Sequence, residues 1–169
     1  MSESTQQHRA EARKTVRCAV VTVSDTRTLE TDRGGLMLAE SLAGAGHTIT
    51  RREIVPDDQN RIRSLVEELA DATLLDAILI TGGTGIAARD QTYETVSALL
   101  TKTLPGYGEL FRMLSYEDIG PAAMLSRTIG GVIGQVVLLT MPGSTAAVRL
   151  ALDKLILPEL AHVVHEARK

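Results

Sequence analysis

The sequence predicts an α/β fold with a mostly parallel central sheet, and two observations support this prediction. Short apolar runs rich in β-branched residues, at Arg17–Val23 and Ala77–Thr81, are typical of strands that are buried on both faces of a parallel sheet. Segments with apolar residues at helical spacing alternate with these runs, which is the pattern of βαβ units. The length of 169 residues fits one domain, at roughly 150 residues per domain.

Two helices and one strand are expected between these two runs. The first helix begins at Asp32 and ends before Gly44 and Gly46. A strand follows at His47–Val55, and Asp57-Asp58 opens the second helix. Apolar residues on one side of each helix are expected to face the core: Leu36, Leu38, Ala39 and Leu42 in the first, and Ile62, Leu65, Val66 and Leu69 in the second.

The second half of the chain predicts further helices and a hairpin. Aliphatic residues and glycines in Ser126–Thr140 predict two strands with a tight turn near Gly134, forming an antiparallel edge of the sheet. Helices are expected at Thr92–Thr101, at Tyr107–Ser115 after Pro105, at Ser144–Ile156, and at Glu159–Ala167 after Pro158. Apolar residues in the segment 107–114 would lie either in the core or in an interface between copies of the chain.

The composition argues against several classes of function. A net charge of −3 provides no general basic field for nucleic acid or anionic lipid, and one Phe, three Tyr and no Trp leave little surface for base stacking. A single cysteine, Cys18, excludes an intramolecular disulfide and a multi-cysteine zinc site. No apolar run is long enough to span a membrane. Residues 1–14 are polar and are expected to be a flexible tail before a single domain at 15–169, in a cytoplasmic protein.

The loops that follow parallel strands gather at one edge of a sheet, where α/β proteins bind ligands. The chain supplies four such loops: Ser24-Asp25, Pro56–Asp58, Thr81–Gly85 and Met141–Ser144. The glycines of Thr81–Gly85 let backbone N–H groups approach an anion such as phosphate, although an isolated turn of this kind needs glycine for its geometry alone. Met141–Ser144 leads into a helix N-terminus, which also favours an anion. Two anion-binding loops on one edge favour a polyphosphate ligand.

Carboxylates at the same edge would repel a phosphate, and a divalent cation would remove that conflict. Asp57 and Asp90 are the candidates, since Mg²⁺ is commonly bound by one or two carboxylates together with substrate phosphate oxygens. Simpler structural roles compete with this hypothesis. Either Asp57 or Asp58 would cap a helix, and Thr92 as N-cap with Glu94 in the first turn is ordinary helix-start chemistry. Asp90 lies outside that helix start.

Two other motifs carry little weight. Gly83–Ala88 matches the G-x-G-x-x-A pattern of dinucleotide-binding folds, but it follows the third predicted strand and no helix pattern resumes until Thr92. A dinucleotide-dependent oxidoreductase would rest on that match alone. His162 and His165 share one side of the last predicted helix, where histidines usually face solvent and complement the helix dipole, so we assign them no function.

Several motifs together resemble one known family. They are Val23–Asp25, Pro56-Asp57, Thr81–Gly85 followed by Arg89-Asp90-x-Thr92, Pro105–Glu109, Leu125–Arg127 and Met141–Ser144. The combination resembles the MoaB/MogA family of molybdenum cofactor biosynthesis, and the compact length and Met-Pro-Gly-Ser are closer to MoaB. The resemblance covers about Arg17 to Pro158. It implies a three-layer α/β sandwich, with helices on both faces of the sheet, that assembles as a homotrimer or homohexamer.

The same resemblance implies an enzyme, a molybdopterin adenylyltransferase that uses Mg²⁺ and ATP. Asp57 and Asp90 would be the catalytic acids and would hold the metal. Nucleotide and pterin would lie along Ser24, Asp25, Thr81, Gly82, Gly83, Thr84, Gly85, Thr92, Glu94, Ser126, Pro142, Gly143 and Ser144. A downstream enzyme that inserts molybdate would be a further partner. The alternative is a non-catalytic molybdopterin-binding or carrier protein of the same fold.

Overall fold

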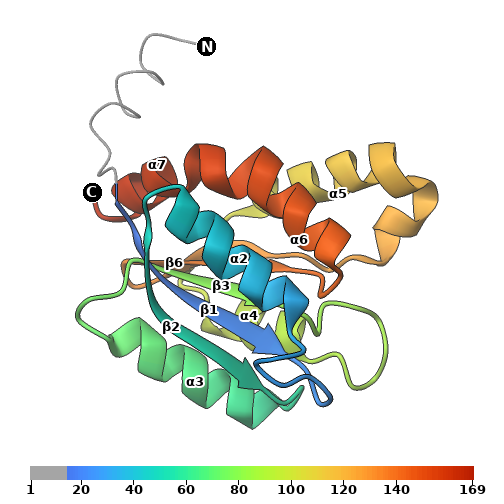
Figure 1. Cartoon of the computed structure of the whole chain (residues 1–169), viewed down its shortest axis with the longest axis horizontal. Helices are drawn as coiled ribbons and strands as arrows, with labels where there is room; N and C mark the ends of the chain where they lie inside the picture. The colour runs from blue at the N-terminus through green and yellow to red at the C-terminus, as the bar shows by residue number, and fades with distance from the viewer. Residues whose placement is uncertain (1–14) are drawn as a thin grey trace, which may run out of the picture.

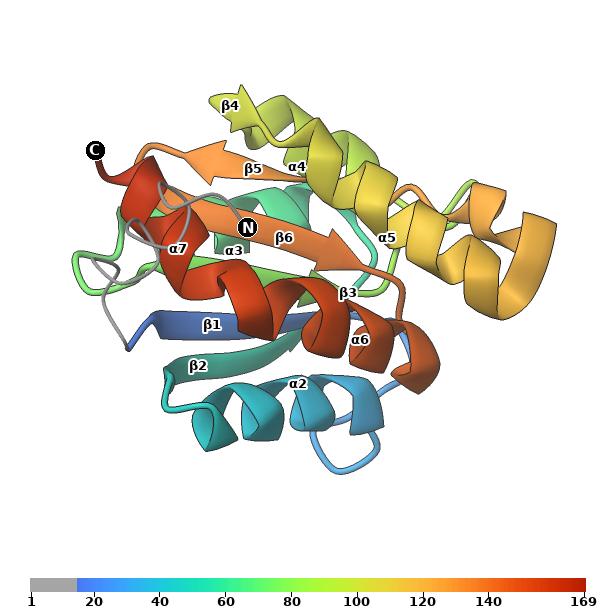
Figure 2. The same cartoon turned by 90° about the horizontal axis from the view of Figure 1, so that it is seen from above.

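The computed structural model describes residues 15–169, which form a sheet between two layers of helices (Figures 1 and 2). The tail predicted for residues 1–14 lies outside the described residues. The sheet is six-stranded, with the strand order β2-β1-β3-β6-β5-β4. Its strands are β1 (Arg17–Val23), β2 (Thr48–Val55), β3 (Ala77–Thr81), β4 (Lys102–Thr103), β5 (Gly130–Ile133) and β6 (Val136–Met141).

Most of the sheet is parallel, and an antiparallel pair completes one edge. β1 is parallel to β2 and β3, and β3 is parallel to β6. β5 runs antiparallel to β6 and to β4, and the β5–β6 turn contains Gly134 at φ +57°. The predicted mostly parallel sheet with an antiparallel edge is therefore confirmed. The sequence did not predict β4, because this exposed two-residue strand has no apolar alternation.

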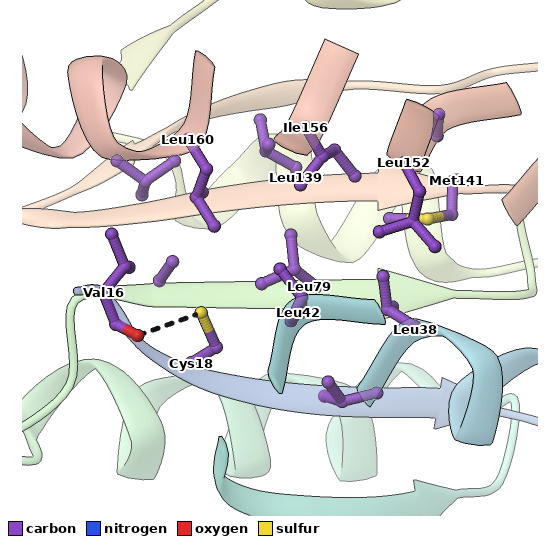
Figure 3. Packing of buried hydrophobic residues seen from close by; sticks show 14 of the residues in the cluster. Val16, Cys18, Leu38, Leu42, Leu79, Leu139, Met141, Leu152, Ile156 and Leu160 are labelled. Atoms are coloured by element: carbon purple, nitrogen blue, oxygen red, sulfur yellow. Dashed lines mark hydrogen bonds between the residues drawn. The ribbon is translucent and has the colours of Figure 1, made fainter. Parts of the chain in front are cut away.

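Helices cover both faces of the sheet and create two apolar cores, which confirms the three-layer arrangement. One face carries α2 (Arg33–Gly44), α5 (Pro105–Ile119), α6 (Thr145–Ala151), the π-helical turn η2 (Leu152–Ile156) and α7 (Leu157–Ala167). The other face carries α3 (Gln59–Asp71) and α4 (Thr92–Leu99). In the first core, Leu79 and Leu139 of the sheet meet Leu38 of α2 and Ile156 and Leu160 of the C-terminal helices (Figure 3).

Two aspartates begin the helices that follow β1 and β2. The buried carboxylate of Asp32 accepts a hydrogen bond from Gly35 N at 2.9 Å, and Asp58 accepts one from Arg61 N at 2.9 Å. Since Asp58 is the cap of α3, its neighbour Asp57 is not needed for that purpose. The predicted N-cap role of Thr92 is wrong: the cap residue of α4 is Gln91, and the buried Thr92 hydroxyl donates to Gly82 O at 3.0 Å.

Some predicted details of the helices need correction. Leu36 is 42% exposed, because α2 buries a narrower stripe than the sequence pattern indicated. The expected break before Glu159 is absent, since helical structure continues without interruption from Thr145 to Ala167. Pro158 is accommodated directly after the π-helical turn, where the wider spacing relieves the clash and the missing N–H of an interior proline. α5 also runs beyond the expected end at Ser115, into the 3-10 helix η1 (Gly120–Leu125).

The apolar residues of α5 divide between the core and the surface. Tyr107 and Phe111 are buried, and the Tyr107 hydroxyl donates to Thr140 O at 3.0 Å. Leu110 and Met113 are exposed. The segment was expected to lie in the core or in an interface between copies of the chain, and its aromatic residues lie in the core. In the part of the chain that the structure covers, every helix is too short or too polar to cross a membrane.

A cluster of ion pairs around the buried Asp76 lies at the amino-terminal ends of β1 and β3. The glycine loop lies at the other end of these strands. Asp76, at 2% exposure, accepts hydrogen bonds from Arg17 N at 2.7 Å and from Arg17 Nη2 at 2.8 Å. Arg168 Nη2 lies 2.5 Å from Asp76 Oδ1. Burial alone would raise the pKa of Asp76, but the hydrogen bonds from Arg17 and the charge of Arg168 hold it below its ordinary value. The cluster joins β1, β3 and the end of the chain.

Asp76→Asn is expected to lower the free energy of unfolding by about 1–3 kcal/mol at pH 7, because charge-assisted hydrogen bonds are lost from a buried site. The folded pKa of Asp76 is depressed, so its contribution is present above the unfolded pKa of about 3.9 and is lost as pH falls through the folded pKa. Urea unfolding of both proteins at pH 7 and at pH 3 measures this. An equal loss at both pH values would contradict the prediction.

Candidate active site

A cavity of about 490 Å³ opens at the carboxyl ends of β1, β3 and β6. Its wall combines the loops that follow these strands with one side of α5 and η1. Predicted site residues on the wall are Ser24, Gly82, Gly83, Thr84, Gly85, Asp90, Ser126, Pro142, Gly143 and Ser144. The remaining lining residues are Val23, Thr26, Arg27, Phe111, Ser115, Ile119, Ala122, Ala123, Leu125 and Ala147.

The glycine loop after β3 needs glycine for two separate reasons. Gly82 and Gly83 have φ of +101° and +63°, a region that other residues rarely adopt. A Cβ on Gly82 would also collide with Val23 O, and one on Gly83 would collide with the Thr92 hydroxyl. Gly82 N is already used in a 3.0 Å hydrogen bond to Met141 O. Within residues 15–169, no group accepts a hydrogen bond from the backbone N–H of Gly83, Thr84 or Gly85. These three donors are therefore available to a ligand.

Asp57 lies directly behind this loop. Its Oδ1 accepts a hydrogen bond from Gln91 N at 2.9 Å, its own N–H donates to Asp25 Oδ1 at 3.0 Å, and its Oδ2 would be 2.8 Å from a Cβ on Gly83. Burial raises the pKa of Asp57 above its ordinary value, and the negative charges of Asp90 and Asp25 raise it further, against the hydrogen bond from Gln91. The positive charge of Arg89 also acts against this rise.

Asp90 lies on the cavity wall at the other end of the same loop. Its Oδ2 accepts a hydrogen bond from Ala87 N at 2.8 Å and would be 2.6 Å from a Cβ on Gly85. The structure thus packs both carboxylates against one loop, Asp57 beside Gly83 and Asp90 beside Gly85, but only Asp90 lines the cavity. Asp25 is exposed and supports Asp57 rather than lining the cavity.

These two carboxylates form a donor set that fits Mg²⁺. Among the described residues no group of three His, Cys, Asp or Glu side chains could hold a metal by itself. Mg²⁺, however, is commonly held by one or two carboxylates and completed by substrate phosphate oxygens and water. Asp57 Oδ2 and Asp90 Oδ1 accept no hydrogen bond from the rest of 15–169, so each has an oxygen for a cation.

Several predicted site residues hold the loops together, and two of them, Ser126 and Ser144, also line the cavity. The Thr81 hydroxyl donates to Pro142 O at 3.0 Å, which joins the loops after β3 and β6, and the buried Thr92 fixes Gly82 as described above. Ser144 caps α6, accepting a hydrogen bond from Ala147 N at 3.2 Å. The Ser126 hydroxyl lies 2.7 Å from that of Thr128.

Arg127, which was not among the predicted site residues, clamps the loop that carries Asp90. Its Nε donates to Gly85 O at 2.7 Å, its Nη2 donates to Asp90 O at 3.0 Å, and its Nη1 is paired with Glu94. Glu94 therefore neutralises Arg127 outside the cavity. The Leu-Ser-Arg motif was the only sequence signal that included Arg127. The residues around Arg127 do not indicate which distant carbonyl groups its side chain binds.

Arg127→Ala is expected to lower the melting temperature by a few degrees, because two hydrogen bonds and an ion pair that hold the 84–94 loop are lost. Thermal unfolding measures this effect, and faster amide exchange in 84–92 would locate the change. Arg63→Ala is the control, because Arg63 pairs with Glu67 only on the surface of α3. Unchanged amide exchange in the loop would contradict the clamp.

The wall opposite the glycine loop is apolar, and the sequence did not predict it. It consists of Phe111, Ile119, Ala122, Ala123 and Leu125, from α5 and η1. A polar, glycine-rich side facing an apolar side is a composition suited to an organic ring that carries charged groups. The helical pattern of 107–115 could not show which residues would face a loop far along the chain.

Comparisons with known proteins agree with this architecture. Residues 19–162 match a family model described as "Probable molybdopterin binding domain". The chain is 55% identical to molybdenum cofactor biosynthesis protein B of Bacillus anthracis over 98% of this chain and 99% of the relative. The corresponding protein of Bacillus subtilis is 53% identical, with 98% of each chain covered.

Solved structures show the same relationship. A crystal structure of a molybdenum cofactor biosynthesis protein B superposes with a TM-score of 0.90 at 56% identity, covering 94% of this chain and 99% of that one. The tungsten cofactor synthesizing protein MoaB of Pyrococcus furiosus gives 0.84 at 37% identity, covering 94% and 100%. The Mog protein of Mycobacterium ulcerans gives 0.83 at 28% identity, covering 90% and 99%.

The fold and its glycine-lined cavity place the chain in the class of α/β proteins that contain the probable molybdopterin binding domain. The chain belongs to the MoaB/MogA family of molybdenum cofactor biosynthesis proteins. Its identity to the MoaB proteins is higher than its identity to the Mog protein, so the expectation of a closer relation to MoaB is confirmed.

Proposed function

We propose that the protein is a molybdopterin adenylyltransferase. The observation that carries the proposal is that Asp57 and Asp90 both pack against one glycine loop with available N–H donors. In the reaction, an oxygen of the molybdopterin phosphate attacks the α-phosphorus of ATP. A new P–O bond forms, the bond between the α-phosphorus and the bridging oxygen breaks, and pyrophosphate leaves with the electron pair.

The residues of the cavity contribute mainly by placement and charge. The apolar wall that includes Phe111 and Leu125 would hold the pterin ring, and the loop at Gly83–Gly85 would hold phosphate oxygens through its N–H groups. Asp57 and Asp90 would hold Mg²⁺, which supplies positive charge for the phosphate oxygens when it is bound. Phosphoryl chemistry of this kind needs no protein nucleophile, because the attacking oxygen belongs to the substrate.

The proposal is tested by incubating the purified protein with molybdopterin and Mg-ATP. Adenylylated pterin and an equal amount of pyrophosphate are expected, detected by mass spectrometry and by a coupled pyrophosphate assay. Omitting molybdopterin should stop pyrophosphate release, and chelating the metal should stop both products. The absence of product with a protein that binds both substrates would contradict the proposal.

A carrier protein is the second candidate, and one observation favours it. Asp57 and Asp90 each use one carboxylate oxygen to hold the loop, through Gln91 N and Ala87 N, which is a structural role that a carrier would also need. A carrier would bind molybdopterin but would show no Mg²⁺-dependent affinity for ATP. Calorimetric titration with each ligand distinguishes the two functions.

We also propose that copies of the chain assemble through a surface on α5 and η1. Large apolar side chains are exposed there: Leu110, Met113, Tyr116, Ile119, Met124 and Leu125. Exposed apolar side chains on neighbouring elements favour burial against further copies of the chain, as a homotrimer or homohexamer. Native mass spectrometry measures the number of copies. A downstream enzyme that inserts molybdate would consume the adenylylated product.

A further inference from the structure

Arg27 is the one Lys or Arg side chain on the cavity wall within residues 15–169. It was not among the predicted site residues. The glycine loop carries Asp90 on the same wall and has Asp57 packed against it, and the ligand proposed above carries several negative charges. A single guanidinium in this position is therefore the natural side-chain partner for a phosphate group.

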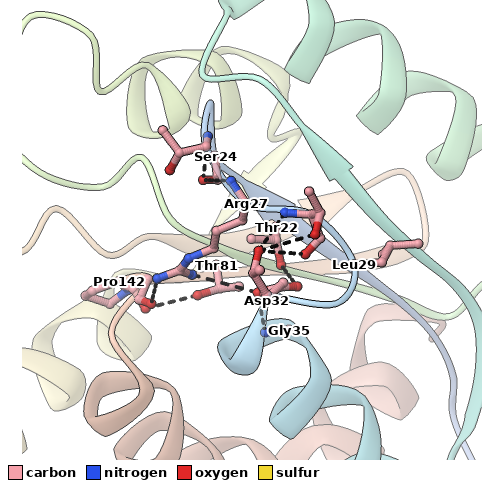
Figure 4. Close-up of polar contacts among 12 residues, drawn as sticks. Thr22, Ser24, Arg27, Leu29, Asp32, Gly35, Thr81 and Pro142 are labelled. Atoms are coloured by element: carbon pink, nitrogen blue, oxygen red, sulfur yellow. Dashed lines mark hydrogen bonds and ion pairs between the residues drawn. The ribbon is translucent and has the colours of Figure 1, made fainter.

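The structure holds Arg27 between the loops that follow β1 and β6 (Figure 4). Its backbone N–H donates to Ser24 Oγ at 3.2 Å, which turns the chain after β1. Its Nη2 donates to Gly143 O at 3.0 Å, and its Nη1 would be 3.7 Å from a Cβ on Gly143. The guanidinium thus lies beside Gly143, on the part of the wall that β6 provides, whereas Asp90 is held on the loop after β3.

The nearest carboxylate to Arg27 is already compensated by another arginine. Asp32 is 1% exposed and accepts hydrogen bonds from Gly35 N at 2.9 Å, from the Thr22 hydroxyl at 2.8 Å and from Arg52 Nη2 at 3.1 Å. Arg27 Nη1 is 3.8 Å from Asp32 Oδ1, beyond hydrogen-bond distance. Asp32 therefore orients Arg27 without consuming its hydrogen-bonding capacity.

We propose that Arg27 binds an oxygen of a phosphate group of the ligand, at the Gly143 end of the cavity. The inference rests on the proposed function and adds a residue that selects for phosphate. The present partner of the guanidinium is a neutral peptide carbonyl, and a phosphate oxygen is a stronger acceptor because it is charged. Arg27 beside Gly143 and a cation held by Asp57 and Asp90 beside the glycine loop would together neutralise the charges of the ligand. The phosphate belongs either to molybdopterin or to ATP.

The test compares Arg27→Gln and Arg27→Lys with Arg52→Gln. Arg52 is a matched control, because it binds the same Asp32 carboxylate but does not line the cavity. Molybdopterin and Mg-ATP are titrated separately by calorimetry, at several NaCl concentrations. Arg27→Gln is expected to weaken the binding of one of the two ligands by tenfold or more, and to reduce the salt dependence of that affinity. Arg27→Lys keeps the charge and should retain part of the affinity.

Each result has a definite meaning. The ligand that Arg27→Gln affects identifies which phosphate Arg27 binds, and an unchanged melting temperature shows that the effect is local. Wild-type affinity for both ligands in Arg27→Gln would overturn this inference while leaving the proposed function intact. An equal loss of affinity in Arg52→Gln would also overturn it, since Arg27 would then act only through the Asp32 network. A wild-type protein that binds neither ligand would overturn both proposals.

Discussion

Asp90→Asn is expected to reduce adenylyl transfer by about a hundredfold or more while the protein folds normally. The substitution removes a charge that would hold the metal and the substrate phosphates at the cavity. It preserves the size of the side chain, and the amide oxygen of asparagine can still accept the hydrogen bond from Ala87 N. The rate of pyrophosphate release and the melting temperature are the two measurements.

Asp58→Asn is the matched control for this loss of charge. Asp58 is adjacent in sequence to Asp57 and carries the same charge, but it caps α3 and does not line the cavity. Asparagine is as good an N-cap as aspartate, so stability and turnover should both remain near the wild-type values. A large fall in the melting temperature of Asp90→Asn, with turnover preserved, would show that Asp90 serves only to hold the loop.

Local patterns were sufficient to predict the fold because its strands are buried runs and its helices have one apolar side. Arg17–Val23 and Ala77–Thr81 match β1 and β3 residue for residue, and the alternation with helices places their carboxyl ends at one edge. The π-helical turn before Pro158 was not predictable in this way. The turn lets α6 and α7 both pack on the sheet, although Pro158 lacks the N–H that an interior helical residue donates.

The candidate site was predictable only in part, for a different reason. Glycines and carboxylates after strands are visible in the sequence, and the parallel topology explains why they meet. Arg27, Arg127 and the apolar wall with Phe111 depend on contacts between segments far apart in the chain, such as that of Arg27 with Gly143. An arginine after a strand or an apolar residue on a helix has no local feature that indicates a cavity.

Gly83→Ala is expected to lower the free energy of unfolding by about 3 kcal/mol and to abolish ATP binding, because the glycine has two independent constraints. Its φ of +63° is unfavourable for alanine, and the new Cβ would collide with the Thr92 hydroxyl and lie 2.8 Å from Asp57 Oδ2. Relief of that collision must move Thr92 or Asp57. Urea unfolding measures the stability, and calorimetric titration with Mg-ATP measures the binding.

Gly134→Ala separates the two constraints. Gly134 has a similar φ of +57° in the β5–β6 turn, but a Cβ there would meet nothing within 4 Å. This variant should lose only about 1 kcal/mol, the cost of the backbone conformation, and should bind Mg-ATP as the wild type does. The difference between the two variants therefore measures the collision behind the glycine loop. If Gly83→Ala lost no more stability than Gly134→Ala and still bound ATP, the close packing of Asp57 and Thr92 against the loop would not control the site.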